Sequence, residues 1–64
     1  MRVTKIIQSP VIDSDGKWNV FCQVLRGSSY VYGVIVCDTM CEAFALKEGQ
    51  NISANKFDYR IKNV

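Results

Sequence analysis

The sequence predicts one small domain over residues 1–64, mainly β in structure (α+β) with one short helix near residues 39–48. Three observations predict this class: strand-like alternation over much of the chain, turn residues between the alternating segments, and helix signals in only one segment. This order of elements is typical of a small barrel or a curved antiparallel sheet of four or five strands, OB-like or SH3-like.

The first segment, residues 1–12, is rich in β-branched residues and carries Pro10. Because proline cannot donate to a strand ladder, we expect Pro10 at a bulge, a strand end or a sheet edge. The run Asp13-Ser14-Asp15-Gly16 then predicts a hairpin turn. It does not fit a calcium loop, because Val11 stands where the first oxygen ligand is needed.

Between this turn and a second one at Arg26-Gly27-Ser28-Ser29, the even positions from 18 to 24 are apolar. We expect these residues, Trp18 included, in the core. From 30 to 37 both faces are apolar, which predicts a strand covered on both sides, in a closed barrel or under a partner. In the last segment we expect core side chains at Phe57, Tyr59 and Ile61.

A helix is predicted to begin at Thr39, since Thr39-x-x-Glu42 fits a capping box, and to end near Gly49. Met40, Ala43 and Phe44 are expected to share one face of this helix. Cys41 lies near the helix start, but a catalytic thiol needs a positioned base and the chain has no histidine. We therefore expect Cys41 to be a small buried apolar residue.

Residues 34–52, VIVCDTMCEAFALKEGQNI, resemble the half-barrels of TOBE or Mop type in molybdate-binding proteins. In that family a strand leads into a short helix, a Leu-Lys-x-Gly turn and another strand, which Leu46-Lys47-Glu48-Gly49 followed by Ile52 matches. The resemblance implies an OB-like barrel and, as one alternative, an oligomer that binds oxyanions. The N-terminal MRVTKIIQSP lacks the Ser-, Ala-, Arg- and Asn-rich motif that contributes to the oxyanion site in that family.

Composition limits the chemistry further. Three cysteines and no histidine exclude a complete disulfide framework and supply at most three thiolates for zinc. No catalytic group, metal ligand set or cofactor motif is predicted, so we expect a non-enzymatic protein. Unpaired cysteines, and no apolar stretch of signal-peptide or membrane-span length, favour the cytoplasm.

The preferred function is binding or adaptor activity through protein–protein contacts, with self-association into a homo-oligomer included. By size and composition, the chain is comparable to small phage proteins that inhibit host defence enzymes by covering a surface. The alternative is an OB-like single-stranded nucleic-acid binding protein in which aromatic side chains stack on bases and basic side chains contact phosphates. The candidate binding residues are Phe21, Tyr30, Tyr32, Lys17, Arg26, Lys56, Arg60 and Lys62.

Overall fold

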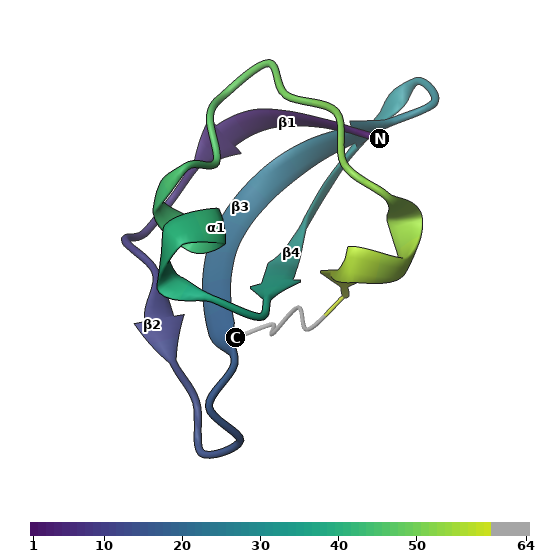
Figure 1. The fold of residues 1–64 in the computed structure, drawn as a ribbon. Coiled ribbons are helices and arrows are strands. Elements are labelled where there is room, and N and C mark those ends of the chain that lie inside the picture. Colours follow the sequence, from purple (N-terminus) through teal and green to yellow (C-terminus); the bar gives the residue numbers. More distant parts are fainter. Residues whose placement is uncertain (60–64) are drawn as a thin grey trace.

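The computed structural model describes residues 1–59, which form one curved, open antiparallel sheet with a short helix on its concave side (Figure 1). The strands are β1 (Arg2–Ile6), β2 (Val11–Ile12), β3 (Trp18–Arg26), β4 (Ser29–Cys37) and β5 (Phe57–Asp58). The helix is α1 (Met40–Phe44), and a single 3-10 turn, η1 (Ala54–Lys56), precedes β5. The prediction of a mainly β fold with one short helix is confirmed, as a curved sheet and not as a closed barrel.

The strands follow the order β1-β3-β4-β5, and β2 also pairs with β3. β1 lies against one end of β3 and β2 against the other, so the first segment is one edge strand interrupted between Ile7 and Pro10. Pro10 directly precedes β2, where its missing N–H costs no ladder bond. Its predicted position at a strand end on an edge is confirmed.

Both predicted turns are present. Asp13 Oδ1 accepts hydrogen bonds from the backbone N–H groups of Asp15 and Lys17, at 2.9 and 3.0 Å, and Gly16 takes the left-handed conformation. The hairpin between β3 and β4 closes through Gly27-Ser28, with Arg26 opposite Ser29 and a positive φ of 62° at Gly27. Glycine at the first central position is typical of the type II′ turns that join twisted strands.

The β3–β4 pairing sorts the side chains between the two faces of the sheet. Val20 lies opposite Ile35 and Val24 opposite Val31, all directed to the concave side, which holds the core. The buried core residues are Val3, Val20, Cys22, Val24, Ile35, Cys37, Ala43 and Phe57. The prediction for the even positions of β3 is therefore confirmed, except that Trp18 is only partly buried against this cluster.

The helix is shorter than predicted. Its start is as expected, since Thr39 Oγ1 accepts from the Glu42 N–H at 3.2 Å. The Glu42 carboxylate accepts from the N–H of Asp38, at 3.1 Å, which completes the cap one residue earlier than in the usual capping box. α1 ends at Phe44, five residues before Gly49.

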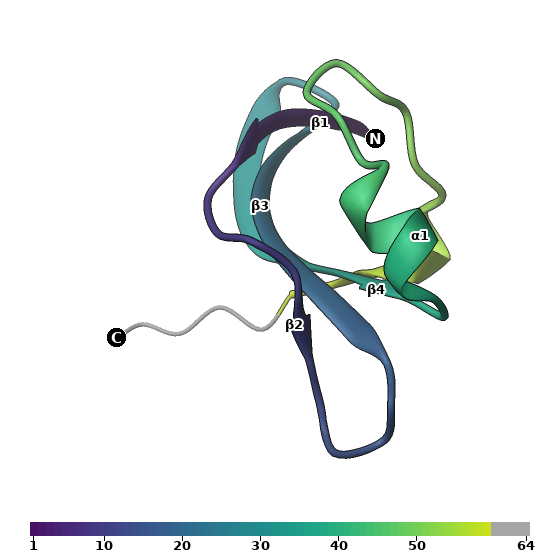
Figure 2. The ribbon, with the colours of Figure 1, turned by 60° about the vertical axis from the view of Figure 1, so that its left-hand side comes forward.

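The reason for this early end is tertiary. Gly49 N–H donates to the Val3 carbonyl at 2.6 Å, and Val3 N–H donates to the Gln50 carbonyl at 2.8 Å. The chain after α1 thus pairs with the free edge of β1 instead of continuing a helix. Residues 45–53 arch over the concave side, and Figure 2 shows α1 and this arch inside the curve of the sheet. Within residues 1–59, no helix has the length and apolar character needed to cross a membrane.

Two predictions about the last segment have different outcomes. Phe57 is buried as expected, and its ring lies edge-on to Tyr59 with 4.9 Å between centroids. Tyr59 is exposed, so its assignment to the core is wrong, because β5 lies at the edge of the sheet and ends at Asp58. Ile61 lies outside the described residues.

Gly33 is required by the approach of β5. A Cβ at this position would lie 2.5 Å from the Phe57 ring and 2.5 Å from the backbone carbonyl oxygen of Asp58. We expect Gly33→Ala to lower the free energy of unfolding by about 1–3 kcal/mol, because the carbonyl can move only with its strand. Urea denaturation followed by fluorescence tests this. Ser29→Ala, on the exposed start of the same strand, serves as the control and should change stability by less than about 0.5 kcal/mol; equal effects of the two would contradict the steric explanation.

Candidate functional site

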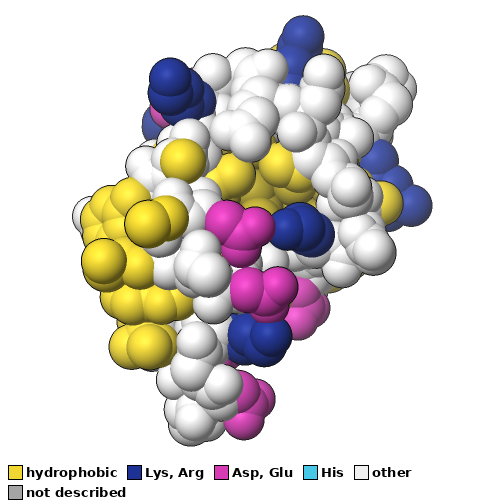
Figure 3. Space-filling view, viewed as in Figure 1, with side chains coloured by type: hydrophobic (Ala, Val, Ile, Leu, Met, Phe, Trp, Pro, Cys, Tyr) yellow, Lys and Arg dark blue, Asp and Glu magenta, His cyan; other side chains and the backbone are white. Residues whose placement is uncertain are grey.

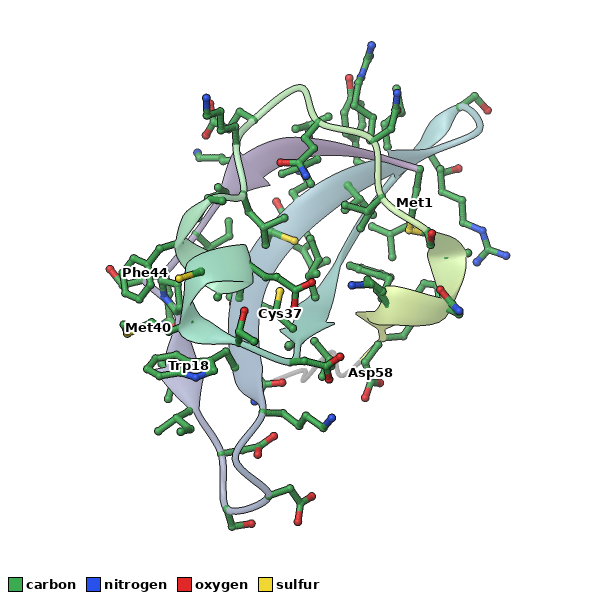
Figure 4. All side chains as sticks on the ribbon, in the orientation of Figure 1. Met1, Trp18, Cys37, Met40, Phe44 and Asp58 are labelled. Atoms are coloured by element: carbon green, nitrogen blue, oxygen red, sulfur yellow. The ribbon has the colours of Figure 1, made fainter. Side chains whose placement is uncertain are left out.

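Four apolar side chains from three elements form one exposed surface, here called the apolar patch: Ile12, Trp18, Met40 and Phe44. Ile12 lies directly opposite Trp18 in the β2–β3 pair. The ring of Trp18 is edge-on to that of Phe44, with 6.1 Å between centroids, and Met40 precedes Phe44 by about one helical turn. Figure 3 shows apolar atoms gathered over β2 and α1, and Figure 4 shows Trp18, Met40 and Phe44 side by side.

The patch is exposed because α1 is too short to bury more than one residue. Only Ala43 of the helix is buried, while Met40 is 53% and Phe44 is 60% exposed. Ile12, on the two-residue edge strand β2, is 53% exposed. Met40 and Phe44 lie side by side as predicted, but of the three residues expected on one helix face only Ala43 is buried. Single exposed apolar residues are ordinary, whereas a contiguous group across three elements is a candidate contact surface.

A second surface lies on the convex side of the sheet and includes three of the predicted binding residues. Phe21 alternates with the core residues of β3, and Tyr30 and Tyr32 lie opposite Leu25 and Gln23 in the register. All three therefore lie on one face. Tyr30 is 62% exposed, so this face of β4 is not covered there by the described part of the chain. The predicted covering of residues 30–37 on both faces would therefore require a partner.

Polar and basic side chains border these tyrosines. The Gln23 amide donates to the Tyr32 hydroxyl at 3.1 Å and accepts from Thr4 at 2.9 Å, which links β1, β3 and β4 across the convex face. Arg2 and Lys5 of β1 lie opposite Leu25 and Gln23, which puts two exposed basic residues on the same face. Neither Arg2 nor Lys5 was among the predicted residues. The alternation of side chains along residues 2–6 does not show which strand pairs with them, and so does not place them beside the tyrosines.

Among residues 1–59, the predicted basic residues do not gather around Phe21. Lys17 pairs with Asp38 at 2.6 Å, and this hydrogen bond raises the pKa of Lys17 and lowers that of Asp38. Lys56 lies 3.7 Å from Glu42 on the concave side. Arg26, two positions after Val24, lies on the core side of β3 and contacts Tyr59 instead, both through a hydrogen bond to its hydroxyl and over its ring. Arg60 and Lys62 lie outside the described residues.

The third feature is a hollow of about 350 Å³ between β4, α1, the arch and η1. Its apolar lining comes from Ile35, Cys37, Leu46 and Ile52, and its polar lining includes Glu42 and Lys56. In Figure 3 apolar atoms are visible at the floor, with oppositely charged side chains next to each other along the margin. A hollow of this size is at the lower end of the range of small-molecule pockets, about 300–1,000 Å³.

The three thiols differ in environment. Burial raises the pKa of Cys22 to about 11 and also raises that of Cys37. Cys41 is exposed on α1, so the prediction that it is buried is wrong. Among residues 1–59, no three histidine, cysteine, aspartate or glutamate side chains cluster closely enough to hold a metal ion.

No protein-family model, curated protein or solved structure matches this chain. The resemblance of residues 34–52 to TOBE or Mop half-barrels therefore depends on those residues alone. Function is therefore inferred from the geometry of the apolar patch, the convex face and the hollow.

The thiol environments give a direct prediction. At pH 8, alkylation requires a thiolate and access, and burial with a raised pKa denies both to Cys22 and Cys37. We expect iodoacetamide to add one group to the folded protein, at Cys41, and three after unfolding in urea, as read by mass spectrometry. Cys41→Ser is the control, and it should remove the adduct of the folded protein. Labelling of Cys22 in the folded protein at a rate similar to that of Cys41 would contradict the structure.

Proposed function

We propose that the protein is a non-catalytic binding protein that acts through protein–protein contacts made by the apolar patch. The observation that carries the proposal is the contiguous exposure of Ile12, Met40 and Phe44 around the ring of Trp18. Aromatic residues and methionine are enriched at the centres of protein interfaces, where they fill pockets on the partner and lose water.

The first partner we propose is a second copy of the same chain. The patch carries no ionisable group, so two copies can meet around a two-fold axis without bringing like charges together. A chain of this length buries only about 60% of its unfolded surface, which leaves a small stability margin that association would increase. A stable interface takes about 800 Å² from each partner, so the four side chains of the apolar patch would form its centre and the surface around them its rim.

A larger protein is the other partner in this class. An inhibitor that blocks an enzyme by covering its surface would present an uncharged patch with a protruding aromatic ring to an apolar depression on the enzyme. Phe44 has this character, because it extends from a five-residue helix and is held from one side by Trp18.

We expect the wild-type chain to sediment as a dimer, and Phe44→Glu to weaken the dimer by at least about 30-fold, the effect of losing an interface hot spot. Tyr30→Glu is the matched control, because Tyr30 is as exposed as Phe44, 62% against 60%, and lies on the convex face. Sedimentation equilibrium at increasing protein concentration measures both.

A wild-type chain that stays monomeric at submillimolar concentration would exclude the second copy as partner. A partner of another kind is then tested in cells with p-benzoylphenylalanine in place of Phe44 or of Tyr30. If light produces no protein adduct specific to position 44, the proposed function is wrong.

Single-stranded nucleic-acid binding is a second candidate, favoured by one observation on the convex face. Tyr30 and Tyr32 are two positions apart on one side of β4 and both are exposed, with Arg2 and Lys5 on the same face. Exposed rings beside basic side chains are the elements from which stacking surfaces are built. Oxyanion binding stays a prediction of the family resemblance, since no structural observation adds to it.

For this candidate we expect a labelled oligo-dT to bind more weakly to Tyr32→Ala, by about 5- to 100-fold, as loss of one stacking ring does. Binding should fall steeply as salt rises, because neutralised phosphates release counterions. Fluorescence anisotropy measures both effects. Phe44→Ala is the control and should bind like wild type; equal losses in the two variants, or no binding at low salt, would count against the convex face.

A further inference from the structure

We propose that the concave hollow binds a small zwitterion with an apolar side chain, of the class of the free apolar α-amino acids. The site has an apolar floor and one ion pair, Glu42 with Lys56. The floor is formed by Ile35, Cys37, Leu46 and Ile52, and the lining also includes Gln50, Asn51 and Ser53. The hollow lies on the opposite side of α1 from Met40 and Phe44, and the proposal does not rest on the function proposed for the apolar patch.

The floor determines the apolar part of the ligand. Ile35 and Cys37 of β4 are buried at the back of the hollow, and Leu46 and Ile52 are partly buried on the arch that closes one side. None of these four side chains carries a charge. Because burial raises the pKa of Cys37, this thiol stays protonated near neutral pH and acts as a small apolar group.

The two charged groups determine the polar part. The Lys56 ammonium and the Glu42 carboxylate are 3.7 Å apart and half exposed. This separation exceeds that of an N–H···O hydrogen bond, about 2.7–3.2 Å, so each group keeps hydrogen-bonding capacity towards a third partner. Their half-exposed side chains place them where the hollow meets solvent.

Glu42 is fixed in this position. Its Oε1 accepts from the Asp38 N–H at 3.1 Å, and its Oε2 is the oxygen that faces Lys56. The carboxylate therefore cannot move away from an incoming anion without losing its hydrogen bond from the Asp38 N–H. A ligand with an anionic group alone would meet this carboxylate, and one with a cationic group alone would meet Lys56.

A ligand with both charges on one carbon avoids both conflicts. Its carboxylate would pair with Lys56 and its ammonium with Glu42, while its apolar side chain would take the place of water over Leu46 and Ile52. Because half-exposed ion pairs contribute little and a single apolar side chain is buried, we expect a dissociation constant on the order of 1 mM.

The test is a titration of the ¹⁵N-labelled protein with L-leucine, followed by the amide shifts of residues that line the hollow. We expect saturable shifts for Leu46, Ile52 and Lys56. Alanine should bind about 50-fold more weakly, since it lacks three carbon atoms of apolar surface. Two analogues isolate the charges: 4-methylpentanoate lacks the ammonium group and 3-methylbutylamine lacks the carboxylate. Each should bind about 5-fold more weakly than leucine, the upper end of the effect of an exposed ion pair.

Four variants separate the site from general effects of charge. Glu42→Gln keeps an acceptor for the helix cap and removes the charge, and Lys56→Met keeps the length of the side chain; each should weaken leucine binding by about 5-fold. Asp38→Asn and Lys17→Met are the matched controls, because they change net charge equally at the ion pair outside the hollow. They should leave leucine binding unchanged.

Three outcomes would overturn the proposal. One is the absence of saturable shifts at high millimolar leucine. Another is binding of 4-methylpentanoate as tight as that of leucine, or tighter binding of leucine to Glu42→Gln, either of which would define a simple anion site. The third is an equal loss in the control variants, which would mean a nonspecific electrostatic effect.

Discussion

The long pairing between β3 and β4 is the constraint on which the rest of the structure depends. Its unbroken register from Trp18–Cys37 to Arg26–Ser29 assigns every side chain of both strands to one face. The concave face receives the core, and the convex face receives Phe21 and the two tyrosines. β1 and β2 then attach to β3, and β5 attaches to β4, at positions that this hairpin provides.

The scarcity of covering structure explains both the apolar patch and the hollow. The concave side is covered by one five-residue helix and by an arch that pairs with β1, and no second helix lies between them in the described part of the chain. Because α1 buries Ala43 alone, its remaining apolar residues stay outside, next to Trp18. The ion pair between Lys56 and Glu42 connects η1 to α1 at the surface, and the hollow lies beside it, over Ile35 and Cys37 of the core.

Ion pairs also determine which basic residues are available on each surface. Two of the lysines in the described residues pair with carboxylates on the side of α1, which removes them from any phosphate-binding role near Phe21. The basic residues that do lie beside the tyrosines come from β1. The apolar patch, the convex face and the hollow are therefore chemically distinct, and each can be tested by substitutions that leave the other two unchanged.

The sequence by itself determined the features that depend on neighbours along the chain. Strand alternation identified the core residues of β3, Asp13 and Gly27 marked the two hairpin turns, and Thr39 marked the helix start. Each of these is a property of φ/ψ preference or of a hydrogen bond within a few residues. The position of Pro10 at an edge strand is also predictable from the sequence, because proline lacks a backbone N–H.

Only the tertiary structure decided where α1 ends, that Cys41 and Tyr59 are exposed, and which carboxylates Lys17 and Lys56 meet. These outcomes depend on contacts between distant residues, such as Gly49 with Val3 or Lys56 with Glu42. Local propensity contains no information about them, because the partners, such as Val3 for the backbone of Gly49 and Gln50, are distant in the sequence.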